Sequence, residues 1–203
     1  DGNSLVYSGG SWINETLAYG IDDLTDVTLG TATQDHVLTY NGSAWESASL
    51  PPSGKVYQVQ SFTQDAAVQT SDYVLNGFGD VSISVNITPI DATSKVFVTI
   101  NGQMAISDST QHVFLRLVRN TTNIAQSTGA TTLDSTHFFK TTDAGNSIPF
   151  SISFVDEPGT TNQVTYKLQA AIENAGRVLF FNRNLASDDY RGVTTITAME
   201  VIP

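Results

Sequence analysis

Histidines and neighbouring acids are the residues of this chain that could carry catalysis or hold a metal. The histidines are His36, His112 and His137, and none lies at the His-x-His or His-x-x-x-His spacing of a metal site. The sequence has no Gly-x-Ser-x-Gly motif and no phosphate-binding loop. Cysteine is absent, which excludes disulfides and thiolate ligands. We therefore expect no enzyme activity, no bound metal and no cofactor.

Two groups of aspartates leave a choice open. Asp22, Asp23 and Asp26 are arranged somewhat like a calcium loop, but the turn glycine and the glutamate of the twelfth position are missing. They form either a cation site or an ordinary solvated turn. Asp188 and Asp189 could supply half of a glycosidase pair, which needs a second acid across a cleft, or they could form another solvated turn.

The composition limits the partners that the chain can have. Charged residues make up 14% of 203 residues, against a norm of roughly 25%, and the formal net charge is −11. Such an acidic chain is repelled by nucleic acid and by anionic membranes. No apolar run approaches the ~18 residues that span a bilayer. We expect neither nucleic-acid binding nor membrane insertion. The chain begins at Asp1, without a methionine or a signal-like segment, and we expect it to be part of a longer protein.

A repeat occupies residues 1–50. The segment from Leu5 to Trp12 recurs 33 residues later, so that Tyr7 corresponds to Tyr40 and Trp12 to Trp45. Each copy predicts a short hairpin with an aromatic strand, a glycine-containing turn and a closing tryptophan. Neither copy has enough apolar residues for a core, so the module needs neighbouring copies or chains. We expect residues 51–54 to be a linker.

Longer strands are predicted in residues 55–203. Apolar and polar residues alternate along several segments, and helical periodicity is not evident. The predicted strands are 81–87, 95–106, 113–119, 148–154, 164–172, 177–182 and 193–202. An all-β chain with one-sided alternation and short polar turns predicts an antiparallel, jelly-roll-like β-sandwich.

The segment Lys95 to Arg119 predicts a central hairpin about the turn Ser107–Thr110. One face of it is apolar. The other face mixes aromatic, amide and basic side chains, and carries Phe97, Asn101, Gln103, His112, Phe114 and Arg116 together with Thr99, Ala105 and Val118. Such a face is typical of a covered surface. A second packed layer, a subunit contact and a ligand remain as alternatives. Glu200 either pairs with Arg116 or Arg119 in such an interface or faces outward on an edge strand.

Two long loops are candidates for binding, because long loops on a rigid sandwich often carry it. We expect one from about Gln126 to Ser147, with His137, Phe138, Phe139 and Lys140, and the other from Arg183 to Gly192, with Asp188, Asp189, Tyr190 and Arg191.

The segments Ile21–Val27 and His36–Trp45 together resemble the repeats of bacteriophage tail-fibre proteins. The segments Ile87–Pro89, Val113–Arg119, Pro149–Asp156, Val164–Lys167 and Thr194–Glu200 resemble the terminal β-domain that often follows those repeats. The resemblance implies an elongated homotrimeric virion protein whose distal domain binds the host surface, and it transfers no catalytic residues. Low charge with abundant Thr and Asn suits a glycan ligand.

We therefore expect a virion location, as a tail fibre or a capsid-surface appendage. Other virion proteins are expected to dock on the N-terminal repeats, and Trp12 and Trp45 are expected at subunit contacts. Two alternatives to host attachment remain: a capsid-decorating or collar fibre without a receptor role, and a polysaccharide-degrading spike.

Overall fold

The structure is a computed structural model that describes residues 3–16, 21, 24–30, 36–49, 56–71, 77–129, 133–185 and 191–202. It divides into two compact units, Asp1–Pro51 and Pro52–Pro203, which are considered separately. The predicted linker, residues 51–54, lies outside the described residues. The described elements are strands, and no helix among them is long and apolar enough to cross a bilayer.

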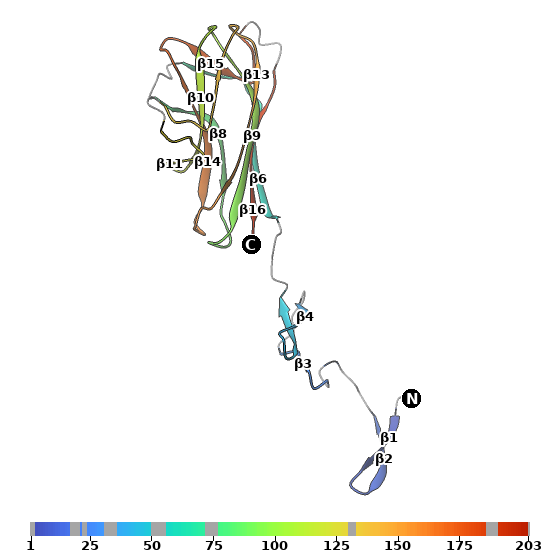
Figure 1. Cartoon of the computed structure of the whole chain (residues 1–203). Coiled ribbons are helices and arrows are strands. Elements are labelled where there is room, and N and C mark those ends of the chain that lie inside the picture. Colours follow the sequence, from blue (N-terminus) through green and yellow to red (C-terminus); the bar gives the residue numbers. More distant parts are fainter. Residues whose placement is uncertain are drawn as a thin grey trace. The chain divides into compact units, whose positions relative to one another are not determined.

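The first unit contains the two predicted hairpins (Figure 1). Strands β1 (Asn3–Ser8) and β2 (Ser11–Thr16) pair with Tyr7 opposite Trp12, and strands β4 (His36–Tyr40) and β5 (Trp45–Ser49) pair with Tyr40 opposite Trp45. Gly9 and Gly10 both have positive φ, as the two central residues of a type I′ hairpin turn require. Each copy of the repeat therefore folds as a short hairpin. A short third strand, β3 (Val27–Thr28), was not predicted and runs parallel to β5.

The second unit is built from eleven described strands. Their bounds are β6 (Val56–Gln64), β7 (Val68–Ser71), β8 (Gly79–Ile87), β9 (Lys95–Ile106), β10 (His112–Arg119), β11 (Thr122–Ile124), β12 (His137–Lys140), β13 (Ile148–Asp156), β14 (Val164–Ile172), β15 (Val178–Phe181) and β16 (Thr194–Val201). They form two sheets that face each other as a sandwich (Figure 1). We call them the β9 sheet and the β10 sheet, each after the strand that pairs with the most neighbours.

We call each place in the strand order of a sheet a strand position. Three of these positions are each filled by two shorter strands that lie end to end. In the β9 sheet, β15 and β16 lie end to end along the side of β9 opposite β13, and β7 and β6 continue one another beside them. In the β10 sheet, β11 and β12 lie end to end along the side of β10 opposite β14. Each sheet therefore has four strand positions among the described residues.

The order of these positions is that of a jelly roll. Numbered along the chain, the positions run 1-8-3-6 in the β9 sheet (β6/β7, β15/β16, β9, β13) and 2-7-4-5 in the β10 sheet (β8, β14, β10, β11/β12). Except at the β10–β11 hairpin, each consecutive pair of positions lies in different sheets. This arrangement is the double Greek key of jelly-roll domains. The predicted all-β, jelly-roll-like sandwich is confirmed.

The core lies between the two sheets. Val96, Val98 and Ile100 of β9 are fully buried, and they face the equally buried Val113, Leu115 and Leu117 from the β10 sheet. Every second residue of β8, β14 and β16 joins this interior. Burying a side chain of this size stabilises the fold by about 1.5–3 kcal/mol. The predicted apolar face of the segments 95–106 and 113–119 thus faces the core.

The predicted central hairpin is wrong. Strands β9 and β10 have the expected bounds, but β9 pairs with β13, β15 and β16, whereas β10 pairs with β11, β12 and β14. The segment Ser107–Gln111 crosses from one sheet to the other. The segment between β13 and β14 is a crossing of the same kind. Alternation shows which residues face the core, but two strands facing each other across a core alternate just as two paired strands do.

Candidate functional site

The first predicted binding loop is partly a strand. His137–Lys140 form β12, which pairs with β10 so that Phe138 lies opposite Phe114. Phe139 packs against the core, and Phe138 points outward with 64% of its surface exposed. In the second predicted loop, Asp188, Asp189 and Tyr190 lie outside the described residues, and Arg191 forms a β-bridge with Arg183. The expectation of a loop at His137–Lys140 is corrected.

The residues predicted to share one covered face are divided between two outer faces. Phe97, Asn101 and Gln103 lie on the outside of the β9 sheet, and His112, Phe114 and Arg116 lie on the outside of the β10 sheet. The two groups cannot form one surface, because the core lies between them. The predicted single face is therefore wrong, for the same reason as the hairpin. The two outer faces differ in chemistry.

The outer face of the β10 sheet is a network of paired charges. Lys167 Nζ lies 2.9 Å from Asp80 Oδ2, and Gln169 Nε2 donates to Asp80 Oδ1 at 2.6 Å. Arg116 donates to Gln169 Oε1 at 2.8 Å and lies 4.0 Å from the centre of the Phe78 ring. His112 Nδ1 lies 2.6 Å from Glu173 Oε2, a contact that lowers the pKa of the Glu173 carboxyl. Charged side chains that are paired in this way are readily hydrated, so this face is suited to contact with solvent.

We expect Asp80→Asn to weaken the fold at neutral pH and not in acid. Partial burial raises the pKa of Asp80, but hydrogen bonds from Gln169 and Lys167 outweigh it, so the net pKa is lowered. A lowered pKa in the folded state adds stability above the unfolded pKa of about 4, and this stability is lost as the pH falls through the folded value. Thermal melts from pH 7 to pH 2 should therefore converge for the two proteins at the acid end. Parallel curves would contradict this.

The outer face of the β9 sheet carries no charge along three consecutive rows. Each row runs across the four strand positions through paired residues. The rows are Val155–Phe97–Met199–Val59, Ser153–Thr99–Thr197–Ser61 and Ser151–Asn101–Thr195–Thr63. One row is apolar, and the other two present hydroxyl and amide groups. Beyond the apolar row, Lys95 and Glu157 form an exposed ion pair with an N–O distance of 2.9 Å.

A shallow groove lies at the hydroxyl and amide end of this face. It encloses about 320 Å³ and is lined by Asn101, Gln103, Thr195, Pro149, Gly192 and Val193, together with Gly102. Ser151 Oγ donates to Asn101 Oδ1 at 2.8 Å beside it. The described lining is uncharged and combines amide and hydroxyl groups with the apolar surfaces of proline and valine. Groups of these types can bind neutral polar ligands such as sugars.

The N-terminal unit presents its aromatic residues to solvent. The rings of Tyr7 and Trp12 lie 5.2 Å apart, and those of Tyr40 and Trp45 lie 5.4 Å apart. Trp12 is 68% exposed and Trp45 is 43% exposed. Aromatic pairs of this size usually supply core or interface area. In this unit, therefore, large apolar side chains are available for contacts with other molecules.

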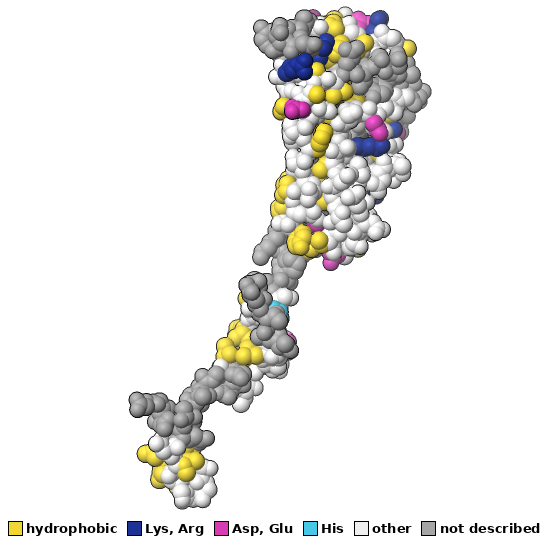
Figure 2. Space-filling view, turned by 180° about the vertical axis from the view of Figure 1, so that it is seen from behind, with side chains coloured by type: hydrophobic (Ala, Val, Ile, Leu, Met, Phe, Trp, Pro, Cys, Tyr) yellow, Lys and Arg dark blue, Asp and Glu magenta, His cyan; other side chains and the backbone are white. Residues whose placement is uncertain are grey.

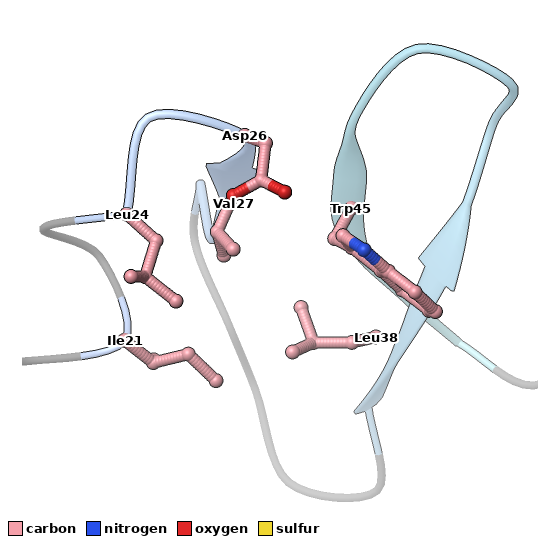
Figure 3. Close-up of a pocket in the computed structure, with 6 residues that line it drawn as sticks. All are labelled: Ile21, Leu24, Asp26, Val27, Leu38 and Trp45. Carbon is pink, nitrogen blue, oxygen red and sulfur yellow. The ribbon is translucent and has the colours of Figure 1, made fainter.

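The second hairpin has an apolar pocket beside it (Figure 3). The pocket encloses about 300 Å³ and is lined by Ile21, Leu24, Asp26, Val27, Leu38 and Trp45. The segment Leu24–Val27 is held against the hairpin because Trp45 N donates to Asp26 O at 2.7 Å. Within the segment, Val27 N donates to Leu24 O at 3.1 Å. Asp22 and Asp23, which are predicted with Asp26 to form either a cation site or a solvated turn, lie outside the described residues.

Glu200 matches neither of its predicted roles. It is fully buried at the end of the interior, on a strand with neighbours on both sides. Its carboxylate accepts hydrogen bonds from Gln58 Nε2 at 2.6 Å and from the backbone N–H of Ile90 at 2.8 Å. Arg119 pairs instead with Asp156. The signal was present in the sequence, because Glu200 shares its alternation with the inward-facing Ile196 and Ala198.

Sequence reasoning also missed Asn182, which is fully buried. Its side chain donates to Gln64 O at 2.7 Å and to Ala66 O at 3.2 Å, and it accepts from Thr194 Oγ1 at 2.7 Å. These bonds join the end of β15 to the start of β16 and to the β6–β7 junction. Within the described parts of the chain, there is no group of three or more His, Asp or Glu residues arranged to hold a metal ion.

Comparisons with known proteins give distant structural similarity only. No protein-family model matches the chain, and no curated protein matches it. Among solved structures, it is similar to a chain of infectious bursal disease virus Gt strain, with 13% identity and a TM-score of 0.42, over 82% of this chain and 42% of that chain. The T13 viral particle of the same virus gives 13% identity and a TM-score of 0.41, over 82% and 44%. The VP2 subviral particle gives 14% and 0.37, over 86% and 46%.

The chain thus spans less than half the length of the viral chains that it matches. Similarity at this level carries no argument about function. The function has to be argued from the chain's own residues and surfaces.

Proposed function

We propose that the chain is a virion structural protein, a subunit of a homotrimeric fibre or surface appendage. The observation that carries the proposal is the twice-repeated hairpin with an outward Tyr–Trp pair. The first hairpin has two strands, the second gains only the two-residue β3, and both expose their Tyr–Trp pairs. Two-stranded hairpins are marginally stable alone in water, whereas several of them packed together can bury such residues. A repeated, coreless module attached to a well-packed jelly roll is suited to a multi-chain stalk with a terminal domain.

The N-terminal hairpins are the contact with sister chains and with other virion proteins in this proposal. Trp12 and Trp45 are the side chains that a partner buries, and the apolar pocket beside Trp45 adds further area. The resemblance of this segment to tail-fibre repeats supports the same role. Tryptophan and tyrosine dominate many interfaces, because they bury large areas with few rotatable bonds.

The terminal domain binds a carbohydrate of the host surface in this proposal. The groove at Asn101, Gln103 and Thr195 supports this, because amides and hydroxyls are the groups that hydrogen-bond sugar hydroxyls. Phe138 and Arg191, two of the residues predicted for recognition, lie exposed on the surface of this domain. The described residues of the groove include no acid, so the proposal is one of binding without cleavage.

Localisation on the particle and adsorption to cells test the proposal together. Cryo-electron microscopy of the virion should show this chain in threefold density at the tail periphery, and the isolated protein should bind host cells and glycans on an array. If the density lies on the capsid surface and no glycan binds, the chain is a capsid-decorating protein and the proposal of host attachment is wrong. Release of reducing sugar from host polysaccharide would contradict the proposal of binding without cleavage.

A further inference from the structure

The four sheet edges of the jelly roll are protected to different degrees. An exposed strand edge can pair with other chains, and proteins protect it with charges, prolines, irregularities or short strands. β13 carries Pro149, and β8 carries Asp80 and an irregularity opposite Lys167–Gln169. The β11/β12 edge is short and interrupted and carries Lys140.

β6 has none of these protections over most of its length. It is nine residues long, with the sequence VYQVQSFTQ, and contains no charge, proline or glycine. Its one irregularity lies near its first residues, where the register to β16 shifts between Glu200 and Val201. Val56, Val59 and Phe62 are all exposed, and Val59 is 53% exposed. Exposed apolar residues on an unprotected edge favour association.

This edge continues into the apolar row of the same sheet. Val59 lies opposite Met199, which lies opposite Phe97, which lies opposite Val155. Val155 at the far side is 51% exposed. We call Val56, Val59, Phe97, Val155 and Met199 together the β6 patch. Figure 2 shows one face of the strand domain, with few charged side chains and hydrophobic side chains spread among uncharged atoms.

We infer that the β6 patch and the adjoining row Ser153–Thr99–Thr197–Ser61 are the surface through which copies of the jelly-roll domain contact one another, while the row of Asn101 and Thr195 stays open at the groove. The inference rests on the proposed homotrimer and names the surface that the terminal domains use. The occupant is a second copy of this chain, which brings the same patch and the same adjoining row of hydroxyl groups. The paired charges of the β10 sheet remain in water.

The distribution of charge on the chain favours contact between two copies at this face. Each chain has a net charge of −11, so two copies repel one another wherever their acidic surfaces meet. The three rows of the β9 sheet carry no charged residue, so copies can approach there without bringing like charges together.

The area of this face by itself falls somewhat short of a standard interface. Four strand positions spaced about 4.8 Å apart and strands about 30 Å long give a face on the order of 600 Å², against about 800 Å² per partner in a standard interface. Side-chain relief raises the accessible area above this flat estimate. The hairpins of the first unit add to the area that the assembly buries.

Single charges in the patch test the inference. Val59→Glu and Val155→Glu each place a carboxylate at a half-exposed position, so the domain should fold unchanged. We expect the concentration for half-dissociation of the full-length assembly to rise at least 100-fold by sedimentation velocity. Phe138→Glu is the matched control, because it adds the same charge on the β10 sheet and should leave the assembly unchanged. Far-UV circular dichroism checks that the variants fold.

A thiol probe gives a second readout, because the chain has no cysteine of its own. The single thiol of Val59→Cys should react with a maleimide at least tenfold more slowly than that of Phe138→Cys. Adding Val155→Glu should remove the difference. If the wild-type chain is a trimer and both glutamate variants remain trimers, this inference is overturned while the proposed assembly stands. If the wild-type chain is a monomer, both fail.

Discussion

Replacing Asn182 with alanine is expected to destabilise the jelly-roll domain by about 4 kcal/mol. The side chain is fully buried and makes three hydrogen bonds, to Gln64 O, Ala66 O and Thr194 Oγ1. Truncation leaves the buried Thr194 hydroxyl without its partner, at about 1–3 kcal/mol for an unsatisfied buried group, and it also removes the bonds to the two carbonyls of the partly exposed β6–β7 junction. Asn182 also has φ of 63°, which costs alanine about 1–2 kcal/mol more than asparagine or glycine.

The surroundings of Asn182 leave little room for repair. Its backbone N–H donates to Gln103 O at 3.1 Å, and its carbonyl accepts from Gly192 N at 3.0 Å. Thr194 fits against β9 because Gly102 has no side chain there, since a Cβ at Gly102 would overlap the Thr194 side chain. Asn182 thus holds both the interruption between β15 and β16 and the junction between β6 and β7. Movement of one strand to fill the gap would disturb the others.

Thermal unfolding of the purified variants measures the effect. A loss of about 4 kcal/mol corresponds to a fall in Tm of roughly 8–16 °C for a domain of this size. Asn182→Gly keeps the favourable backbone and loses only the side chain, so it should fall between wild type and Asn182→Ala. Asn123→Ala, at an exposed position of β11, is the matched control and should change Tm by less than about 2 °C. A Tm for Asn182→Ala within that range would contradict the role given to Asn182.

Asp156→Ala should cost about 3 kcal/mol. The Asp156 carboxylate is buried, and its Oδ2 accepts from Arg119 Nη1 at 2.7 Å and from the Tyr166 hydroxyl at 2.6 Å. Tyr166 is fully buried; burial first, and then its hydrogen bond to Asp156, raises the pKa of its hydroxyl well above the usual value of 10. Removing one partner of a largely buried ion pair leaves the other charge without compensation, which usually costs about 3–5 kcal/mol. Because Arg119 is partly exposed, the stability lost in Asp156→Ala should lie at the lower end of this range.

Two companion variants separate the contributions. Tyr166→Phe removes one hydrogen bond and keeps the ion pair, so it should cost about 1 kcal/mol. Glu157→Ala removes an exposed ion pair with Lys95 and should change stability by less than about 1 kcal/mol. Urea unfolding monitored by tryptophan-independent far-UV circular dichroism ranks the three variants. Equal losses for Asp156→Ala and Glu157→Ala would contradict the buried network.

The inward-facing positions of this domain could be predicted from sequence, and the strand neighbours could not. Val96, Val98 and Ile100 alternate with polar residues, and burial on one face of a strand enforces that pattern. Alternation is local, however, and the partner of β9 is set by the crossings of the jelly roll. Ser107–Thr110 reads as a hairpin turn because short polar segments serve both connections.

Other errors came from residues whose role depends on long-range contacts. The sequence HFFK of β12 lies in a long polar segment, and only pairing with β10 makes it a strand. A carboxylate at Glu200 predicts a surface or interface group, because the donors that hold it inside, Gln58 and Ile90, lie more than a hundred residues away in the sequence. The buried role of Asn182 has no local signal in the sequence. The repeat was predictable, since Tyr7–Trp12 and Tyr40–Trp45 show the same spacing and chemistry twice.

The mass of the intact chain in solution tests the central claim most directly. Light scattering on the eluting peak of a size-exclusion column, at micromolar concentration and physiological salt, should give about 65 kDa, three times the 21.8 kDa of one chain. The value should persist on tenfold dilution, because the hairpins and the β6 patch bury area together. A single, well-folded species of 21.8 kDa at all concentrations would contradict the account.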